Sequence, residues 1–216
     1  MLWRIIVCIL AGYALGNLNG AILTSHLLHN EDVRDKGSGN AGLANFFRNY
    51  GGLDTLIVFV VDAGKSLLAC YVGLWLFQGF DAAFVPTAAM IGGGMSVIGH
   101  IFPVMWSLRG GKGILSGFGI TLFFGFAFGQ WGVLLVCLGA FLIALLLSRY
   151  VSLGSLVVSL AYPFVFWIFL PAEHWVHIIA AVISALAIFM HRGNIVRIFN
   201  GTERKLTFKK KKETTK

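Results

Sequence analysis

Apolar runs alternate with short polar, glycine-rich segments along the whole chain. An α-helix needs about 20 apolar residues to cross the hydrocarbon core of a bilayer. Runs near this length cover residues 2–28, 53–77, 84–108, 155–170 and a last run that ends near Met190. Residues 114–148 are long enough for a hairpin of two further spans that turns at 129–132. The pattern predicts an all-α integral membrane protein with about seven transmembrane helices, or five if the hairpin is re-entrant.

The basic residues orient these spans. Most of them lie in alternate polar segments or in the C-terminal tail, and those in the segments are Arg34, Lys36, Arg48, Arg109, Lys112 and Arg149. The turns between them, at 78–81, 129–132 and 171–174, contain no Lys or Arg. Cytoplasmic loops carry the excess of basic residues, so we expect the N-terminus outside and the C-terminus in the cytoplasm. Arg4 is the one clear exception.

Composition restricts the class of protein. Of the 216 residues, 57% are hydrophobic and 12% are charged, which excludes a soluble globular domain. We expect a single polytopic transmembrane domain over 1–208 and a basic disordered tail over 209–216. The net charge of +8 favours membrane lipid or anionic small molecules as partners. Nucleic acid is not expected, because the chain has no soluble basic domain with interleaved aromatic residues.

One polar segment has the chemistry of an anion site. It runs from Gly99 to Gly113 and ends in Arg109, two glycines, Lys112 and a third glycine, directly before the next apolar run. Glycines allow backbone N–H groups to approach a ligand, and a helix beginning near Ile114 would direct its positive dipole end to the same place. The glycine spacing does not match a Walker loop. The alternative is a basic turn that only sets membrane topology.

Two further segments on the expected cytoplasmic side are polar in the same way. Residues 37–48 combine small residues with Ser38, Asn40, Asn45 and Arg48. Residues 191–203 place His191, Asn194 and Arg197 on one face if the last span continues as a helix. Each segment alone fits an interfacial loop with capping residues. Three such segments on one side of the membrane favour a site for anionic ligands.

Other ionisable residues give weaker indications. Asp62 and Lys65 share a face of the second span, where a buried ion pair is favoured over a Lys65 that reaches a ligand. His174 and His177 have metal-like spacing but no further ligands nearby, so we expect no metal site and no cofactor.

Taken together, the three segments resemble the hallmark motifs of the acyl-phosphate-dependent glycerol-3-phosphate acyltransferases, the bacterial PlsY family. These motifs are Gly-Ser-x-Asn-x-Gly-x-Thr-Asn-x-x-Arg, Gly-His-x-x-Pro followed by Gly-Gly-Lys-Gly, and His-x-x-Asn-Ile-x-Arg followed by Gly-Thr-Glu. They correspond here to 37–48, 99–113 and 191–203. The chain departs from the family at Ala44, Arg109 and Gly193. The resemblance covers the whole chain in order.

The resemblance implies a multi-pass enzyme of the bacterial inner (plasma) membrane with its active site on the cytoplasmic side. Its reaction would transfer a fatty acyl group from acyl phosphate to the 1-hydroxyl of glycerol 3-phosphate. The products would be lysophosphatidic acid and inorganic phosphate, in the first acylation step of phospholipid biosynthesis. Acyl phosphate is already activated, so positioning and charge neutralisation can supply much of the rate without a metal.

Motifs and resemblance together give the candidate site residues. The expected catalytic residues are Ser38, Arg48, Lys112, His191 and Asn194. The expected substrate-binding residues are Gly37, Gly39, Asn40, Asn45, Lys65, His100, Gly110, Gly111, Gly113, Ser155, Arg197 and Glu203. The alternatives are a transporter or flippase for an anionic metabolite, and a non-enzymatic lipid-binding protein. A transporter requires polar residues through the whole membrane, whereas the polarity here collects on one side.

Overall fold

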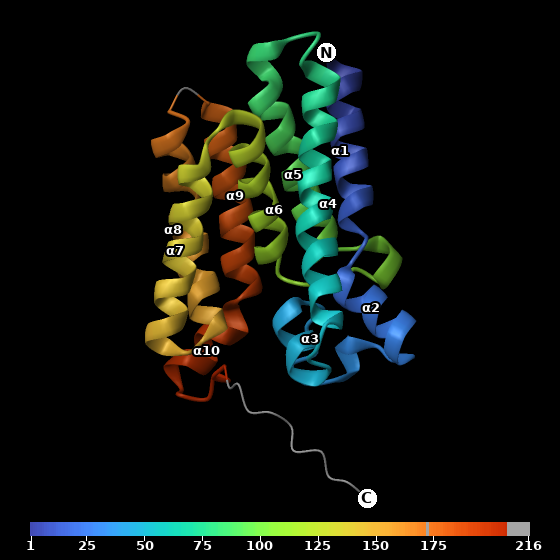
Figure 1. Cartoon of the computed structure of the whole chain (residues 1–216), viewed down its shortest axis with the longest axis vertical. Helices are drawn as coiled ribbons and strands as arrows, with labels where there is room; N and C mark the ends of the chain where they lie inside the picture. Colours follow the sequence, from blue (N-terminus) through green and yellow to red (C-terminus); the bar gives the residue numbers. More distant parts are fainter. Residues whose placement is uncertain (172, 207–216) are drawn as a thin grey trace, which may run out of the picture.

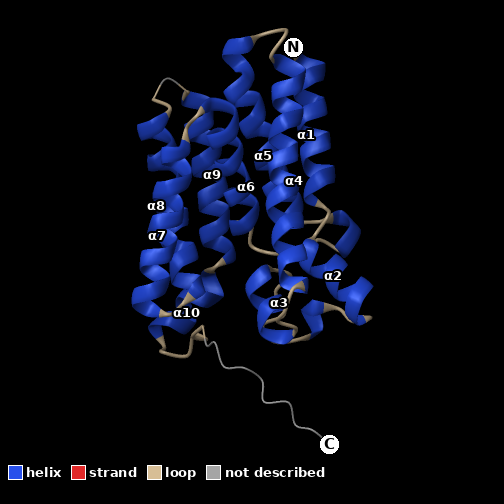
Figure 2. Ribbon diagram, in the orientation of Figure 1, coloured by secondary structure: helices blue, strands red, loops and turns tan. Residues whose placement is uncertain are grey.

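A computed structural model of the chain describes residues 1–171 and 173–206, and the regular elements of this part are helices (Figures 1 and 2). The α-helices are α1 (Leu2–Gly16), α2 (Gly20–His29), α3 (Leu43–Asn49), α4 (Asp54–Phe77), α5 (Val85–Ile101), α6 (Ile114–Phe128), α7 (Trp131–Ser148), α8 (Val151–Phe169), α9 (His174–Met190) and α10 (Arg192–Phe199). Short 3₁₀ turns are η1 (Val33–Asp35), η2 (Ala82–Phe84) and η3 (Val104–Trp106). The expected basic tail at 209–216 lies outside the described residues.

The predicted class, an all-α membrane protein, is confirmed. Five helical segments of the described chain are long and apolar enough to cross a membrane, or six if α9 and α10, bent by 54° at their junction, form one span. The predicted count of seven further requires α6, an apolar helix of 15 residues. In Figure 1, α6 lies between α5 and α9 and follows the direction of the other bundle helices.

The structure adds one break and moves one boundary. The first apolar run is long enough as a whole to cross a membrane, but its helix is interrupted at 17–19. Asn19 accounts for the break, because its side-chain Oδ1 accepts the backbone N–H of Ile22 and so caps a new helix. The turn expected at 149–154 is shorter, since Arg149 has a left-handed φ of 61° and α8 begins at Val151. Ser152 and Ser155 therefore lie on the first turns of a helix.

Glycines bring α1 and α5 into close contact. A Cβ atom added at Gly99 would lie 2.5 Å from the carbonyl O of Tyr13 and 3.0 Å from Cα of Gly16. Membrane helices associate through such small residues, since close backbone approach replaces the hydrophobic driving force that lipid removes. The loop at 102–113 follows α5 directly. The contact with α1 therefore also positions this loop, which forms one wall of the cavity described below.

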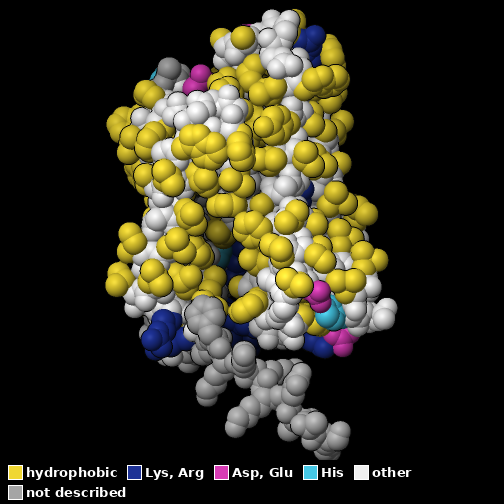
Figure 3. Space-filling view, in the orientation of Figure 1, with side chains coloured by type: hydrophobic (Ala, Val, Ile, Leu, Met, Phe, Trp, Pro, Cys, Tyr) yellow, Lys and Arg dark blue, Asp and Glu magenta, His cyan; other side chains and the backbone are white. Residues whose placement is uncertain are grey.

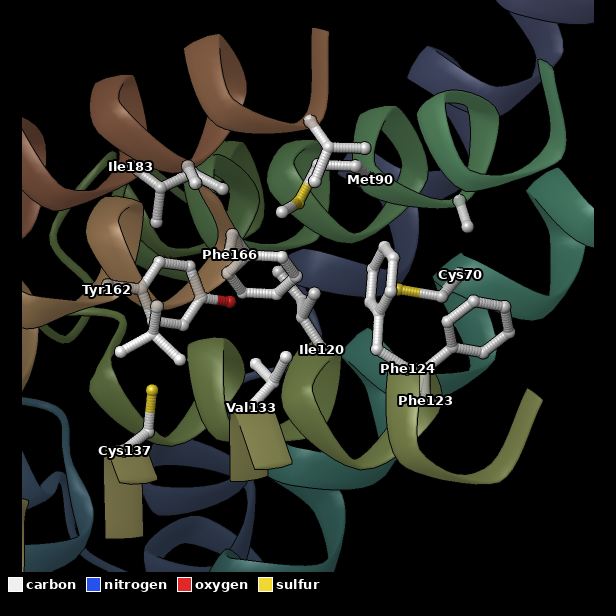
Figure 4. Close-up of a cluster of buried hydrophobic side chains, with 14 of the residues drawn as sticks. Cys70, Met90, Ile120, Phe123, Phe124, Val133, Cys137, Tyr162, Phe166 and Ile183 are labelled. Carbon is white, nitrogen blue, oxygen red and sulfur yellow. The ribbon is translucent and has the colours of Figure 1, made fainter. Parts of the chain in front are cut away.

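Apolar side chains fill the half of the bundle that lies near the N-terminus of α1 and away from α3 and α10 (Figures 1 and 4). Phe124 of α6 packs edge-on against Phe166 of α8 with ring centroids 5.0 Å apart. Ile120, Val133 and Met90 extend this cluster to α6, α7 and α5. The opposite half contains the three polar segments.

Adding a methyl group at Gly99 tests the close contact between α1 and α5. We expect Gly99→Ala to destabilise the protein by about 1–3 kcal/mol, because backbone atoms cannot yield to the new Cβ. Gly139→Ala is the matched control, since a Cβ there meets nothing within 4 Å. Thermal unfolding in detergent measures both variants. Equal melting temperatures for the two would contradict the proposed contact.

Candidate active site

A cavity of about 1130 Å³ opens between the two sides of the bundle at the end formed by α3 and α10. Figure 3 shows it as a hollow in the lower half of the molecule, with basic side chains at its depth. Its mouth is polar, whereas its interior is lined by apolar residues of the membrane helices, including Phe118, Leu138, Val158 and Ile183.

The fold brings the three polar segments together around this cavity. Most of the expected site residues line it, and they are Gly37, Ser38, Gly39, Asn40, Asn45, Arg48, His100, Lys112, Gly113, Ser155, His191, Asn194, Arg197 and Glu203. Lys65, Gly110 and Gly111 do not line it. The segments are far apart along the chain, so their convergence is a property of the tertiary structure.

Asn45 was expected to bind substrate, but in the structure its side chain holds the loop at 37–42. Its Oδ1 accepts the backbone N–H of Ser38 at 2.9 Å. Its Nδ2 donates to the carbonyl oxygens of Val33 and Lys36 at 3.0 and 3.1 Å. Both amide hydrogens are thus used by backbone, and Asn45 is only 2% exposed. Asn45 shapes the loop and has no free donor for a ligand.

Gly110 and Gly111 also have a structural part instead of the expected binding one. Their N–H groups donate to the carbonyl oxygens of Ile101 and His100, at 3.2 and 3.1 Å. A Cβ on Gly111 would overlap with Nε2 of His100, so only glycine allows this approach. Gly113, with φ 82°, precedes α6 without a side-chain cap. The start of α6, whose first N–H groups have no partner within the helix, therefore lines the cavity together with Lys112.

Lys112 is a strongly perturbed cation at the mouth. Burial, followed by the nearby positive charge of Arg197, lowers the pKa of Lys112 to about 8. Its ammonium group donates to Oδ1 of Asn194, which joins the second polar segment to the third. Among the described residues, no carboxylate lies within ion-pair distance of Lys112, an arrangement that suits an anionic ligand.

Glu203 organises the third segment. Its carboxylate accepts hydrogen bonds from Ser152 Oγ at 3.0 Å, Asn194 Nδ2 at 2.9 Å and Arg197 Nε at 2.8 Å. Burial raises the pKa of Glu203, but these hydrogen bonds outweigh it and keep the pKa below its usual value. Glu203 is thus an ionised acceptor that holds three protein donors. It orients Asn194 and Arg197 towards the cavity.

Asp62 and Lys65 form the expected ion pair. Lys65 Nζ lies 2.7 Å from Asp62 Oδ1, which also accepts the backbone N–H of Gly20 at 3.0 Å. Lys65 is 3% exposed and lies behind the cavity wall, so its alternative role in direct ligand contact is wrong. The other carboxylate oxygen, Asp62 Oδ2, is buried without a hydrogen-bond partner among the described residues.

Sequence reasoning missed Arg204 and Ser152 as lining residues. Arg204 donates from Nη2 to the carbonyl O of Gly37 at 3.3 Å and adds a guanidinium beside Arg48. Its position directly after Glu203, within a basic segment, could have indicated from the sequence that Arg204 lines the cavity. Ser152 lies between the expected apolar runs 114–148 and 155–170, and the start of α8 at Val151 could not be seen from residue types alone.

The cavity can therefore bind anionic groups at its mouth and an apolar chain in its interior. Arg48, Lys112, Arg197 and Arg204 supply positive charge, while the free N–H groups of α6 add neutral donors. The described residues contain no group of three or more His, Cys, Asp or Glu placed to hold a metal ion.

Comparisons with known proteins agree with one another. The family model described as glycerol-3-phosphate acyltransferase matches residues 6–201. Glycerol-3-phosphate acyltransferase of Finegoldia magna is 35% identical over 93% of this chain and 93% of its own length. The protein of the same name from Chlorobaculum tepidum is 32% identical over 94% of this chain and 97% of its own.

Solved structures give the same result for the fold. The crystal structure of PlsY (YgiH), an integral membrane glycerol 3-phosphate acyltransferase, in its glycerol 3-phosphate form has a TM-score of 0.79 and 29% identity to this chain. The match covers 94% of this chain and 96% of that one. The lysophosphatidic acid form of PlsY has a TM-score of 0.78 and 25% identity, over 94% and 95% of the two chains.

Removing Asp62 tests the buried ion pair. We expect Asp62→Ala to destabilise the protein by about 3–5 kcal/mol, because it leaves the Lys65 ammonium group buried without a counter-charge. The apolar double variant Asp62→Leu/Lys65→Met should recover much of this loss, since it removes both charges. Thermal unfolding in detergent checks the order of the three proteins. A double variant as unstable as Asp62→Ala would contradict the explanation that the unpaired Lys65 causes the loss of stability.

Proposed function

The chain belongs to the glycerol-3-phosphate acyltransferase family and is an integral membrane acyltransferase, and we propose that it transfers a fatty acyl group from acyl phosphate to the 1-hydroxyl of glycerol 3-phosphate. The products are lysophosphatidic acid and inorganic phosphate. This is the first acylation step of bacterial phospholipid biosynthesis.

The observation that carries this proposal is the combination of a polar, basic mouth and an apolar interior in this cavity. Both substrates bear a phosphate group, and the mouth combines Arg48, Lys112 and Arg204 with the uncapped start of α6. Only one substrate bears a long hydrocarbon chain, and the apolar interior lies directly beyond this mouth. Acyl phosphate fits this arrangement as donor, because its phosphate and its acyl chain meet at the bond to be broken.

Lys112 and the first N–H groups of α6 bind the phosphate of acyl phosphate, helped by the hydroxyls of Ser38 and Ser155. The acyl chain extends between α6, α7, α8 and α9, towards Tyr162 and Ile183 at the edge of the apolar cluster (Figure 4). The chain then lies in apolar surroundings, while the reacting carbonyl stays near the polar mouth.

Arg48, His191 and Asn194 form the glycerol 3-phosphate side of the site. Asn194 accepts a hydrogen bond from Lys112, so the two phosphate-binding parts adjoin. The reaction requires this proximity, because the glycerol hydroxyl must reach the carbonyl carbon that carries the phosphate. Asn40 and the Gly37 and Gly39 backbone complete the wall on the α3 side.

In this mechanism His191 accepts the hydroxyl proton. Its Nδ1 lies 2.8 Å from the carbonyl O of Ala187, which can only accept, so Nδ1 carries the proton and Nε2 is left with a lone pair. The hydroxyl oxygen bonds to the acyl carbon, the bond from that carbon to the phosphate oxygen breaks, and inorganic phosphate leaves. Lys112 stabilises the negative charge that develops on the leaving phosphate.

The same arrangement supports a topology. We propose that α1, α4, α5, α6, α7, α8 and α9 all cross the bacterial plasma membrane, with the N-terminus outside and the cavity facing the cytoplasm. The basic residues of the three polar segments lie at the cavity end, as the positive-inside rule requires. A transporter is disfavoured, because the cluster around Phe124 and Phe166 fills the other half of the bundle.

Purified protein in lipid nanodiscs, without acyl-CoA, tests the reaction. With palmitoyl phosphate and glycerol 3-phosphate, we expect phosphate and lysophosphatidic acid in equal amounts. Lys112→Ala should lower kcat/KM by about 10²- to 10³-fold, because charge stabilisation at the leaving phosphate is lost. Lys36→Ala is the control, since Lys36 pairs with Glu31 outside the cavity. In a parallel assay, product formed only when acyl-CoA replaces palmitoyl phosphate would refute the donor, and full activity of Lys112→Ala would refute its role.

The depressed pKa of Lys112 predicts a pH dependence. Burial makes this ammonium lose its proton at lower pH than a free lysine, at about pH 8. Only the protonated form stabilises phosphate, so kcat/KM should be highest below about pH 8 and fall as the pH rises through it. In Lys112→Arg the side chain stays charged, and the fall should move to higher pH. Identical profiles for the two proteins would contradict the assignment.

A further inference from the structure

The ammonium group of Lys65 uses all of its hydrogen-bond donors inside the protein. Its Nζ lies 2.7 Å from Asp62 Oδ1, 2.8 Å from the carbonyl O of Leu18 and 2.7 Å from Nδ1 of His100. An ammonium group has three N–H donors and no acceptor. Lys65 is therefore saturated by these three partners and has no donor left for a substrate.

These contacts determine where His100 carries its proton. A neutral Lys65 would leave the buried carboxylate of Asp62 without a counter-charge, so the pair is stable with Lys65 protonated. Nδ1 of His100 lies 3.4 Å from Asp62 Oδ1 and 2.7 Å from Lys65 Nζ. Protonated Lys65 can only donate, so at the shorter contact Nδ1 accepts. The imidazole is then neutral, and its single proton lies on Nε2.

The other ring nitrogen of His100, Nε2, lies next to the glycine loop. His100 lines the cavity, and its Nε2 has no hydrogen-bond partner among the described residues. This edge of the ring lies against Gly111, where a Cβ would overlap with it. The carbonyl O of His100 also accepts the N–H of Gly111 at 3.1 Å, which ties the residue to the loop that presents Lys112.

We propose that Lys65 is a positioning residue, which holds His100 as the Nε2–H tautomer so that His100 donates a hydrogen bond to a substrate oxygen beside Lys112. This inference rests on the proposed function, because the oxygen belongs to one of its two substrates. A neutral donor adds a hydrogen bond at a mouth already rich in Lys and Arg without further charge repulsion. Phosphate and carbonyl oxygens share the acceptor chemistry that such a donor recognises.

The break between α1 and α2 provides one of the acceptors that hold Lys65. The Leu18 carbonyl is free to accept because the helix is interrupted at 17–19. Asn19 caps α2 on one side and donates from Nδ2 to the carbonyl O of Ala41 at 3.1 Å on the other. The helix break therefore fixes both Lys65, which contacts His100, and the loop that contains Asn40. Lys65 acts on the substrate through His100 alone.

A double-mutant cycle tests the proposal on the full protein in nanodiscs. We expect His100→Phe and Lys65→Met each to lower kcat/KM by about 10- to 100-fold, because one hydrogen bond to an anionic or developing charge is lost or misaligned. The double variant should be no worse than His100→Phe, since Lys65 acts only through the imidazole. His100→Gln, which keeps an N–H donor near the Nε2 position, should retain more activity than His100→Phe. Additive losses, or equal activity of Gln and Phe variants, would overturn the proposal.

Stability has to be separated from positioning. Asp62→Leu/Lys65→Met removes both buried charges, and we expect it to regain much of the stability lost in Lys65→Met but not the activity. Ser66→Ala is the matched control, because it removes a buried contact between α4 and α5, Ser66 Oγ to Ser96 Oγ at 2.9 Å, one residue away from Lys65. Its kcat/KM should stay near that of the unchanged protein. Activity that follows stability in all these variants would show a merely structural role.

The kinetic split identifies the oxygen. A rise in KM for glycerol 3-phosphate in His100→Phe assigns the hydrogen bond to that substrate, and a rise in KM for palmitoyl phosphate assigns it to the donor phosphate. A fall in kcat alone assigns it to the carbonyl oxygen, which becomes negatively charged only during the reaction. No change in any of these constants would overturn the proposal. Absence of acyl transfer from palmitoyl phosphate by the unchanged protein would instead refute the proposed function.

Discussion

A buried ammonium group in a membrane helix has to find a negative charge and enough acceptors, and this constraint on Lys65 organises the site. One acceptor comes from its own helix at Asp62, one from the break between α1 and α2 at Leu18, and one from α5 at His100. Each is needed because an unpaired charge in low dielectric is strongly unfavourable. The same three contacts join α1, α4 and α5 next to the glycine loop.

The cavity follows from an uneven distribution of packing. On one side, glycines allow α1 and α5 to approach until backbone atoms touch, as at Gly99 and Tyr13. In the half near the N-terminus of α1, aromatic residues such as Phe124 and Phe166 fill the space between α6 and α8. At the other end, the bundle opens and the three polar segments surround the cavity. A substrate with a charged head and an apolar tail matches this gradient.

Polar residues at the mouth are of two kinds: those that hydrogen-bond to other parts of the protein and those with hydrogen-bonding groups left for a ligand. Asn45 and Glu203 each hold three protein groups by hydrogen bonds. Lys112, His191 and the start of α6, whose first N–H groups have no partner within the helix, line the cavity. This division separates ligand-binding groups from groups that orient them. In the proposed reaction, the groups that contact substrate are few, and residues such as Asn45 and Glu203 hold the surrounding segments in place.

The sequence by itself determined the membrane class, the alternate polar segments in which basic residues gather, and the three segments that line the cavity, because hydrophobic length and local residue types encode these features. It also predicted the ion pair between Asp62 and Lys65, since their spacing places them on one helix face. It did not determine the helix break at 17–19 or the saturation of Asn45 and Lys65. Only the tertiary structure decided these, because hydrogen-bond capacity is used up by partners such as Leu18 for Lys65 and Val33 for Asn45, which residue types do not reveal.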